Sequence, residues 1–537
     1  MQHFAGLLNN LLYTPQRNGK FALIGAYLRH APDPDRGYAL AALTGELSLK
    51  HAKAAAIRRL IEARTDPELF RLSYDFVGDL AETAALLWPT ASGAPPPRLS
   101  EVIETLQTLP RTQIEDQLAT WLDRLDADGR WALLKLLTGG LRVGVSARLA
   151  KIALAHYGQV GADEIEEIWH GLEPPYTPLF AWLNGQAGRP DFSDLPVFRP
   201  LMLANPIEAR ELAALNIEDY AIEWKWDGIR VQIAAKAGDV RLYSRSGDDI
   251  SKAFPDIVEP IADHRLLNGV ADGELLVRGD AGAPAGFNDL QQRLNRKTVS
   301  KAMLKRFPAF VRLYDLLFAG DVDLRTLPFI ERRQQLDTLF TRLPAALNPP
   351  VIDRSDLLEP ASLVELDGLR RSCRGDLKEG LMLKRKASRY QAGRPRGDWF
   401  KWKRDPLNLD CVLMYAQRGH GKRSSFYSDY TFGAWQPDDQ GHARLVPVGK
   451  AYSGFTDAEL VKLDRWIRAN TTNRFGPVRE VSPGLVFEVG FDSVHRSSRH
   501  KSGVAMRFPR ILRIRWDKRP DEADQLATLA KLIAHGG

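Results

Sequence analysis

The spacing of hydrophobic residues changes near residue 200, and this change limits the folds that the chain can adopt. Before it, apolar residues recur every three or four positions in segments rich in Ala, Leu, Arg and Glu, which is typical of amphipathic helices. From about residue 220 onward, apolar and polar residues alternate over short runs, which is typical of strands. The pattern therefore predicts a helical part followed by β-rich structure.

Three domains follow from this pattern. The helical segments are residues 26–47, 51–64, 99–109, 113–125 and 128–139. A Pro-rich, aperiodic linker ends this all-α domain, which we place at 1–200. Residues 201–404 combine short strands with a helix at 329–343 and predict an α+β domain. Residues 405–537 hold further strands joined by Gly-rich loops, which favours a small antiparallel β-barrel.

Composition excludes several classes of protein. Of the 537 residues, 44% are hydrophobic and 26% are charged, as in ordinary globular proteins. No apolar run approaches the roughly 18–20 residues that span a bilayer, and the first residues lack the pattern of a secretion signal. Two cysteines, Cys373 and Cys411, are too few for a disulfide framework and fit a reducing compartment. We therefore expect a cytoplasmic protein that does not associate with membranes.

Charge is distributed unevenly along the chain. Residues 1–200 carry 20 basic and 23 acidic groups, residues 201–404 carry 34 and 29, and residues 405–537 carry 20 and 15. The basic excess of the later domains fits a polyanionic partner, although many soluble proteins share it. Within the first domain, segments 50–59 and 141–151 gather cations. There Ser146 is placed to cap a helix whose N-terminal amides face a phosphate.

The sharpest local feature is the run from Glu223 to Arg230, which reads Glu-Trp-Lys-Trp-Asp-Gly-Ile-Arg. Strand alternation puts Glu223 and Lys225 on one face. The Asp-Gly pair is typical of a hairpin turn, in which Lys225 is simply a solvated strand residue. The alternative is that Lys225 is a nucleophile. A free lysine is almost entirely protonated at neutral pH, and it becomes nucleophilic when it is desolvated or placed beside other cations.

Further short motifs supply the cations and acids that such a lysine needs. They contain, in chain order, Arg245, Asp272, Glu274, Glu379, Lys384, Lys401 and Lys403. Taken singly, each motif is an ordinary turn or an amphipathic strand. Their occurrence together, in this order and over about 180 residues, is much harder to obtain by chance.

In this order the motifs resemble those of the ATP-dependent DNA ligases, within the superfamily of lysine nucleotidyltransferases that includes RNA ligases and capping enzymes. Tyr314-Asp315 and the run from Arg507 to Lys518 extend the series, and segments 139–154, 418–425, 447–455 and 488–503 also look like ligase sequence. Many ligases have Phe where this chain has Tyr314. The resemblance implies a helical DNA-binding domain, an α+β nucleotidyltransferase (ATP-grasp-like) domain and a C-terminal OB-fold barrel.

The resemblance also implies a role for each motif residue around ATP. Lys225 attacks the α-phosphate and keeps AMP. Glu223 reads the adenine, and Tyr314 stacks on it, which needs only a π face. Arg230 and Glu274 contact the ribose. Arg245 binds a phosphate of the nucleotide.

The other implied roles concern charge. Glu379, assisted by Glu274, holds Mg²⁺ or Mn²⁺. Lys384, Lys401 and Lys403 lower the pKa of Lys225 and neutralise the α-phosphate. On the barrel, the residues that contact the departing pyrophosphate are Arg507, Arg510 and Lys518.

The function that the resemblance implies is sealing of nicks in duplex DNA by a monomer, in repair, recombination or replication, at the nucleoid if the source is a bacterium. The enzymatic alternatives are an RNA ligase and a capping guanylyltransferase, and the helical first domain favours a DNA ligase over both. NAD-dependent ligases use a cysteine-ligated zinc, which two cysteines cannot provide. A further alternative is a non-catalytic protein that only binds nicks. Such a protein is expected to have a damaged nucleophile motif, whereas the motif in this chain is complete.

Overall fold

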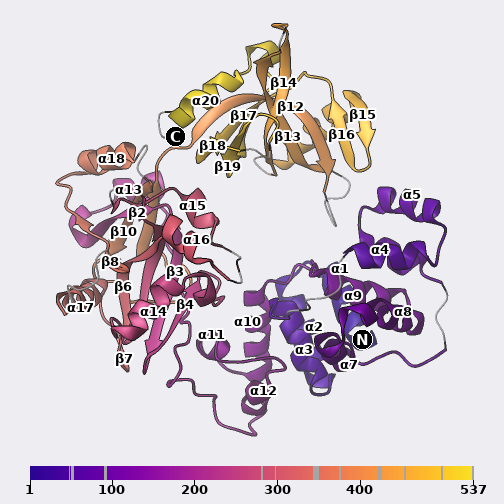
Figure 1. Cartoon of the computed structure of the whole chain (residues 1–537), viewed down its shortest axis with the longest axis horizontal. Coiled ribbons are helices and arrows are strands. Elements are labelled where there is room, and N and C mark those ends of the chain that lie inside the picture. The colour runs from indigo at the N-terminus through magenta and orange to yellow at the C-terminus, as the bar shows by residue number, and fades with distance from the viewer. Residues whose placement is uncertain are drawn as a thin grey trace. The chain divides into compact units, whose positions relative to one another are not determined.

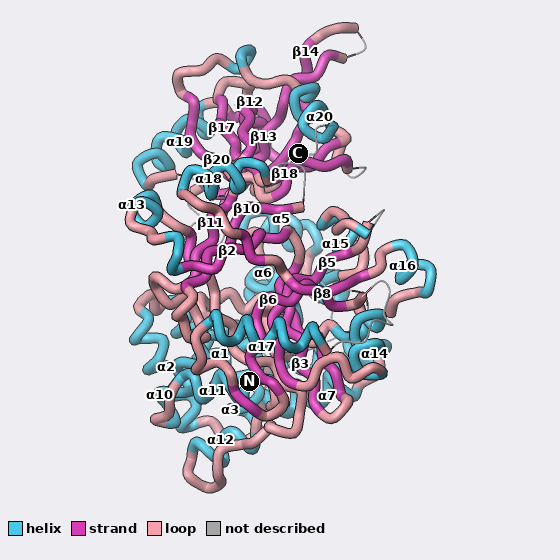
Figure 2. Tube along the Cα trace, turned by 90° about the vertical axis from the view of Figure 1, so that its left-hand side faces the viewer, coloured by secondary structure: helices cyan, strands magenta, loops and turns pink. Residues whose placement is uncertain are grey.

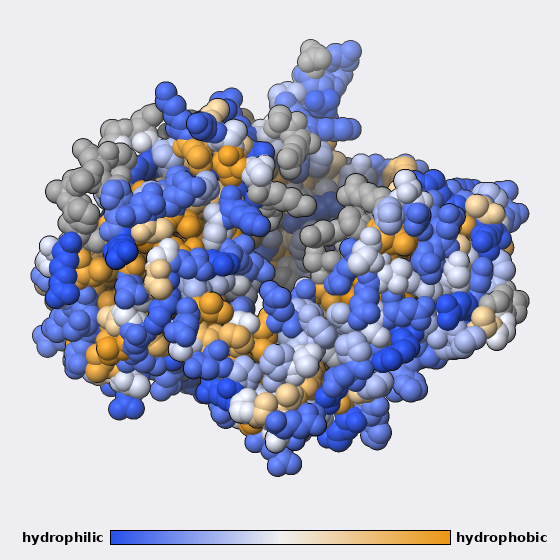
Figure 3. Space-filling view, turned by 60° about the horizontal axis from the view of Figure 1, so that its bottom comes forward, coloured by the Kyte–Doolittle hydropathy of each residue, from blue (hydrophilic) through white to orange (hydrophobic). Residues whose placement is uncertain are grey.

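The computed structural model describes residues 1–47, 49, 54–89, 93–279, 282–294, 296, 298–342, 350–373, 377–419, 426–438, 440–452, 455–497 and 500–534. One compact unit consists of Met1–Gln159, Pro174–Leu183 and Pro406–Gly537, and the other of Val160–Glu173 and Asn184–Asp405. None of the described helices is long and apolar enough to cross a membrane. On the face shown in Figure 3 most residues are hydrophilic, and the hydrophobic ones form scattered patches.

The N-terminal region is helical, as predicted (Figure 1). Its helices are α1 (Gln2–Tyr13), α2 (Arg17–His30), α3 (Asp35–Thr44), α4 (Ala54–Glu62), α5 (Pro67–Val77), α6 (Leu80–Leu87), α7 (Leu99–Thr108), α8 (Ile114–Arg124), α9 (Ala127–Thr138), α10 (Ala147–Gly158), α11 (Ala162–Trp169) and α12 (Thr177–Leu183). The predicted helix 26–47 is interrupted between α2 and α3, because Pro32 and Pro34 cannot continue the helical hydrogen bonds.

Two local features fix the basic turn before α10. Ser146 caps α10 by accepting a hydrogen bond from the backbone N–H of Leu149 at 3.2 Å, as predicted. The buried Lys20 ammonium donates to the carbonyl oxygens of Val143 and Gly144 at 2.8 and 2.7 Å. The other predicted basic segment, 50–59, lies partly outside the described residues.

Helix α11 belongs to the second unit rather than to the helical bundle. Its Glu167 carboxylate accepts hydrogen bonds from Arg199 and Arg325 at 2.7 and 2.9 Å, one on each oxygen. Just after the helix, the ring of His170 packs edge-on against Phe198, with centroids 4.6 Å apart. These contacts tie α11 to the α+β domain.

The α+β domain is built on two sheets. The six-stranded sheet runs β4-β3-β5-β6-β7 with β8 beside β6, and the five-stranded sheet runs β1-β11-β10-β2-β9. The strands are β1 (Asn205–Pro206), β2 (Tyr220–Trp226), β3 (Ile229–Lys236), β4 (Asp239–Ser244), β5 (Gly269–Val277), β6 (Ala309–Ala319), β7 (Val322–Asp323), β8 (Ile352–Arg354), β9 (Leu357–Leu358), β10 (Lys378–Arg385) and β11 (Trp399–Lys403).

Helices and an apolar core join these two sheets. The helices are α13 (Ala209–Ala213), α14 (Pro255–Asp263), α15 (Phe287–Gln291), α16 (Lys301–Arg306), α17 (Phe329–Thr341) and α18 (Leu363–Ser372). Helix α17 lies across β6 (Figure 2). One buried cluster contains Ala221 of β2 together with Ala234, Val270 and Leu317 of the other sheet. The face of β2 that carries Ala221 therefore looks toward the six-stranded sheet.

The Asp227-Gly228 pair does not form a hairpin, although its sequence is typical of one. Strand β2 pairs with β10 and β9, whereas β3 pairs with β4 and β5, so the chain passes from one sheet to the other at this point. A Cβ on Gly228 would lie 2.4 Å from the carbonyl oxygen of Leu275, so the crossing requires glycine.

The C-terminal region folds as the predicted β-rich domain around one apolar core (Figure 1). Its elements are β12 (Leu407–Arg418), β13 (Tyr427–Pro437), β14 (Ala443–Ala451), α19 (Asp457–Ala469), β15 (Thr471–Phe475), β16 (Val478–Val481), β17 (Val486–Phe491), β18 (Ser493–Arg496), β19 (Val504–Arg507), β20 (Arg510–Arg515) and α20 (Leu526–Ala534). The long strand β12 pairs with β13, β16 and β17, which wraps the sheet around its core. The ligase-like segment 418–425 lies almost wholly outside the described residues.

Candidate active site

Lys225 lies near the end of β2, next to the crossing between the sheets. Its neighbour across the pair is Gly380 of β10, which in turn pairs with Lys403 of β11. The next row along the same strands holds Glu223 on β2 and Lys401 on β11. Glu223 and Lys225 therefore share one face, as predicted from strand alternation, and this is the face that carries Ala221.

The Lys225 ammonium forms an ion pair with Glu379. Its Nζ atom lies 2.7 Å from Oε2 of Glu379, and Nζ of Lys403 lies 3.1 Å from the same oxygen. Burial by itself would raise the pKa of Glu379, but the two lysines outweigh it and hold the pKa at about 2. Glu379 is therefore an anion at neutral pH that draws two of the predicted cations together.

Glu274 faces the same group of charges from the other sheet. It lies on β5, directly opposite Arg230 on β3. Burial raises the pKa of Glu274 to about 7, and the negative charge of Glu379 adds to the rise while Lys225 opposes it. These mutual effects show that Lys225, Glu274 and Glu379 belong to one site.

A buried network that the sequence did not reveal holds Arg230. Its Nη2 atom donates to Oδ2 of Asp272 at 2.7 Å, and Nη1 donates to the carbonyl oxygen of Met202 at 2.6 Å. The Tyr390 hydroxyl donates to the same Asp272 oxygen at 2.6 Å, and Asp272 is fully buried. Asp272 is part of the Asp-Gly-Glu motif, but no sequence signal pointed to Tyr390.

The Glu223 end of the site contains Lys384 and Tyr314. Nζ of Lys384 lies 2.5 Å from Oε2 of Glu223 and 4.1 Å from the centroid of the Tyr314 ring. Burial lowers the pKa of Lys384, and Glu223 opposes this. Lys384 was predicted to act on Lys225, but the structure pairs it with Glu223, the predicted adenine reader. The reason is its register, because Lys384 lies opposite Ala221, two steps beyond Glu223.

Lys401 lies among other cations. Burial lowers its pKa, and the surrounding positive charges lower it further. Those charges belong to Arg394, Lys225, Lys403 and Arg245. The exposed Arg245 and the half-buried Lys401 are thus both brought to this side of the pocket, as the motifs predict. Arg394 was missed by sequence reasoning, although the basic, Gly-containing loop before Lys401 could have drawn attention to it.

The three barrel residues are described within their own domain. Arg507 ends β19. Arg510 begins β20, and its Nη1 atom donates to Oδ1 of Asp492 at 3.1 Å. Lys518 donates to Oδ2 of Asp410 at 2.7 Å. The partners of Arg510 and Lys518 are therefore carboxylates of the barrel itself, and a role of these residues toward ATP stays a prediction.

The described residues contain no group of three or more His, Cys, Asp and Glu side chains that could hold a metal ion. The pair formed by Glu274 and Glu379 nevertheless fits a hard divalent cation, because such an ion needs only one or two carboxylates and keeps several waters. Burial raises the pKa of Glu274 and Glu379 adds to the rise, so a cation held by the two carboxylates would stabilise their charged forms.

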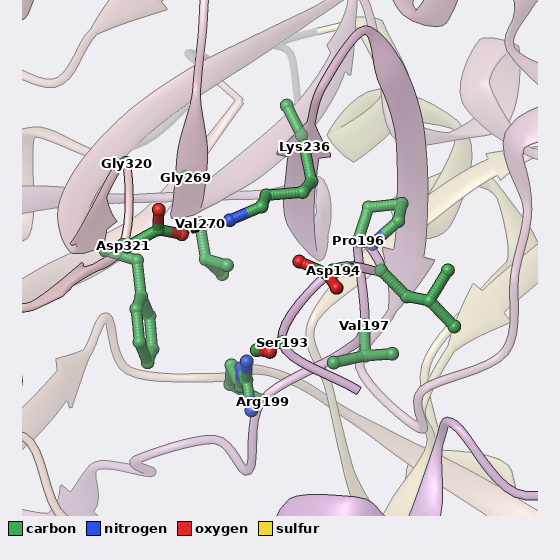
Figure 4. A pocket seen from close by; sticks show the side chains of 13 residues that line it. Ser193, Asp194, Pro196, Val197, Arg199, Lys236, Gly269, Val270, Gly320 and Asp321 are labelled. Atoms are coloured by element: carbon green, nitrogen blue, oxygen red, sulfur yellow. Dashed lines mark hydrogen bonds and ion pairs between the residues drawn. The ribbon is translucent and has the colours of Figure 1, made fainter. Parts of the chain in front are cut away.

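A pocket of about 340 Å³ lies elsewhere on the α+β domain (Figure 4). Segment 193–199 and the ends of β3 and β6 line it, and none of the predicted site residues does. Lys236 and Asp321 form an ion pair there, and Arg199 pairs with Glu167.

Known proteins match this chain over almost its entire length. The family model described as "ATP dependent DNA ligase domain" matches residues 201–403, and that described as "ATP dependent DNA ligase C terminal region" matches residues 423–518. A probable DNA ligase of Koribacter versatilis is 32% identical over 98% of this chain and 95% of its own length. "DNA ligase 1" of Korarchaeum cryptofilum is 28% identical over 99% of this chain and 98% of its own.

A solved structure named "Pmar-Lig_PreS3" has the same fold. It is 16% identical, with a TM-score of 0.61, and the match covers 95% of this chain and 99% of that one. At this identity the likeness concerns the fold alone. The two family models match the later domains, a relative of 32% identity matches over almost the whole chain, and the chain therefore belongs to the ATP-dependent DNA ligases.

Proposed function

We propose that Lys225 is the residue that accepts AMP from ATP, and that the enzyme seals nicks in duplex DNA in three steps. The observation that carries the proposal is the position of the Lys225 ammonium, which shares Glu379 with Lys403 and lies near enough to Lys401 for their charges to interact. A lysine surrounded by other cations is the arrangement that favours a neutral, nucleophilic amine.

Each step forms one bond to phosphorus and breaks another. In the first, Nζ of Lys225 forms a P–N bond to the α-phosphorus of ATP, the bond to the bridging oxygen breaks, and pyrophosphate leaves while the amine proton passes to solvent. In the second, a 5′-phosphate oxygen at the nick takes AMP and the P–N bond breaks. In the third, the 3′-hydroxyl attacks that 5′-phosphate, and AMP leaves.

The ion pair with Glu379 holds the Lys225 side chain in place before ATP binds. Glu379, whose pKa the two lysines hold at about 2, is a poor base. Glu379, with help from Glu274, would hold a divalent cation, Mg²⁺ or Mn²⁺, which would supply positive charge to the phosphates. Lys401 and Lys403 favour the neutral amine and balance charge on the α-phosphate.

The remaining residues are assigned to the nucleotide and its leaving group. We assign adenine to Glu223 and Tyr314, and the ribose to Arg230 and Glu274. Arg245 and Lys384 complete the ATP-binding set. The barrel residues Arg507, Arg510 and Lys518 contact the pyrophosphate during the first step. In support of this division, Glu274 lies opposite Arg230, and Lys384 contacts both Glu223 and Tyr314.

Incubation with ATP labelled at the α-phosphate tests the nucleophile. Lys225→Ala is expected to lose covalent label completely, and Lys225→Arg does not rescue it, because a guanidinium stays protonated near neutral pH. Lys236→Ala, which removes a lysine from the second pocket, is the matched control and keeps the label. Persistent labelling of Lys225→Ala would show that another residue is the nucleophile. Sealing assays with nicked DNA and with nicked RNA, run in parallel, then identify which nucleic acid is the substrate.

A further inference from the structure

The carboxylate of Glu223 is held from both sides by cations. Its Oε1 atom accepts from Nη1 of Arg333 at 3.1 Å, and its Oε2 atom lies 2.5 Å from Nζ of Lys384. Glu223, Lys384 and Arg333 are only 2%, 1% and 3% exposed. Two cations are therefore present in a place where water cannot solvate an isolated carboxylate.

One of these cations connects Glu223 to the aromatic side of the pocket. The Lys384 ammonium that pairs with Glu223 also lies 4.1 Å from the centroid of Tyr314. A base stacked near Tyr314 would therefore have Glu223 close to its edge. The other cation, Arg333, comes from α17, behind the carboxylate.

Arg333 is itself fixed at its other end. Its Nε atom donates to Oδ1 of Asp337, one turn later on α17, at 3.0 Å. Asp337 also accepts from Nη1 of Arg354 at 3.0 Å. The guanidinium is thus anchored between Asp337 and Glu223, and its geometry determines where Oε1 of Glu223 can lie.

We infer that Arg333 is a positioning residue that makes the nucleotide site selective for adenine. The inference rests on the proposed function, in which Glu223 meets the base. An ionised carboxylate only accepts hydrogen bonds. Held by Arg333, it presents an acceptor to the 6-amino group of adenine. A 6-oxo purine offers another acceptor there, and a purine without a 6-substituent offers nothing.

Loss of Arg333 leaves one oxygen of a buried carboxylate without its cation. Such a group turns toward its remaining partner or loses its charge, because an uncompensated buried charge is costly. In either case the acceptor that faces the base is lost or displaced. Recognition of the 6-amino group then fails, while Lys225 and its surroundings remain in place.

The test compares two nucleotides within each variant. The rate of covalent labelling per molar nucleotide is measured for ATP and for purine ribonucleoside triphosphate, which lacks the 6-amino group. A hydrogen bond to a charged acceptor gives the native enzyme a preference for ATP on the order of tenfold to a hundredfold. Because each ratio is taken within one protein, a general loss of activity cancels.

We expect Arg333→Met to reduce this preference to about threefold or less, chiefly through KM for ATP. Arg333→Lys, which keeps the charge without the fixed guanidinium geometry, is expected to fall in between, and it also serves if Arg333→Met does not fold. Arg354→Gln is the matched control, because it removes a guanidinium from Asp337 without touching Glu223, and it keeps the native preference.

Glu223→Gln separates the possible outcomes. It should lower the preference as Arg333→Met does, and the double variant should lower it no further, because both changes remove one interaction. The inference is overturned if the native enzyme does not distinguish the two nucleotides. It is also overturned if both Arg333 variants keep the native preference. Failure of the proposed function looks different, since label would then be absent from the native protein or would persist in Lys225→Ala.

Discussion

The surroundings of Glu223 and the basic segment of the barrel both gather cations, but the two regions bury them to different degrees. Around Glu223, charged groups are buried and neutralise one another. Arg332 and Asp315, for example, are both fully buried and joined by two hydrogen bonds of 2.9 Å. On the barrel, the Arg510 side chain is 43% exposed, and its partner Asp492 is 20% exposed.

The degree of burial affects how the charges of each region can respond to a bound anion. The buried charges around Glu223 are fixed by their partners and need little reorganisation when a nucleotide binds, which is the property of a preorganised site. Arg510 and Lys518 must instead exchange their barrel carboxylates for a new anion. A residue of that kind suits a step in which one domain moves, rather than the constant framework of a site.

The largest expected effect is on the free energy of unfolding, and it compares a buried ion pair with an exposed one. Arg332→Met leaves Asp315 as a buried, unpaired charge and should cost about 3–5 kcal/mol. Arg510→Ala breaks an exposed pair and should cost less than about 1 kcal/mol. Shifts of the urea midpoint measure both. Equal shifts would remove the distinction between pocket and barrel.

The next effect concerns catalysis by the barrel. Arg510→Ala or Lys518→Ala should slow labelling by ATP at least about 100-fold, as loss of a charge-stabilising group does. Sealing of a nick that already carries AMP releases no pyrophosphate, so its rate should stay within about tenfold, a barrier change of roughly 1.4 kcal/mol.

Arg513→Ala is the matched control for these variants. Arg513 lies on the same strand, is 61% exposed and pairs with Glu488. Both reactions should survive its loss. If instead sealing falls and labelling is preserved in Arg510→Ala, the basic segment binds DNA and not the leaving group.

The smallest expected effect tests at which residue the α+β domain begins. Removing residues 1–159 keeps α11, and labelling by ATP should stay within about threefold, since these residues belong to the other compact unit. Removing residues 1–200 also deletes Glu167, whose carboxylate accepts a hydrogen bond from Arg325, and Phe198, which belongs to the buried cluster around Ala221. Labelling should then fall by at least about tenfold, which corresponds to roughly 1.4 kcal/mol. Equal activity of the two truncations would make α11 dispensable.

Much of the fold was predictable because it follows from local patterns. The helices of the first region, the strands around Lys225 and the helix near residue 329 all follow from hydrophobic periodicity. The cap at Ser146 follows from the chemistry of a short polar side chain before a helix. The Asp227-Gly228 hairpin was the misleading local signal, because the same two residues serve equally well where a chain leaves one sheet for another.

The sequence by itself was enough to predict which residues carry chemistry, since the motif from Glu223 to Arg230 and the later acidic and basic motifs can be read without a structure. Only the tertiary structure decided their partners. It brought Glu379 to Lys225, turned Lys384 toward Glu223, and placed Arg333 and Tyr390 behind the predicted residues. The physical reason is that periodicity fixes the face on which a side chain lies, whereas its partner depends on strand register and sheet packing, which join segments distant in the chain.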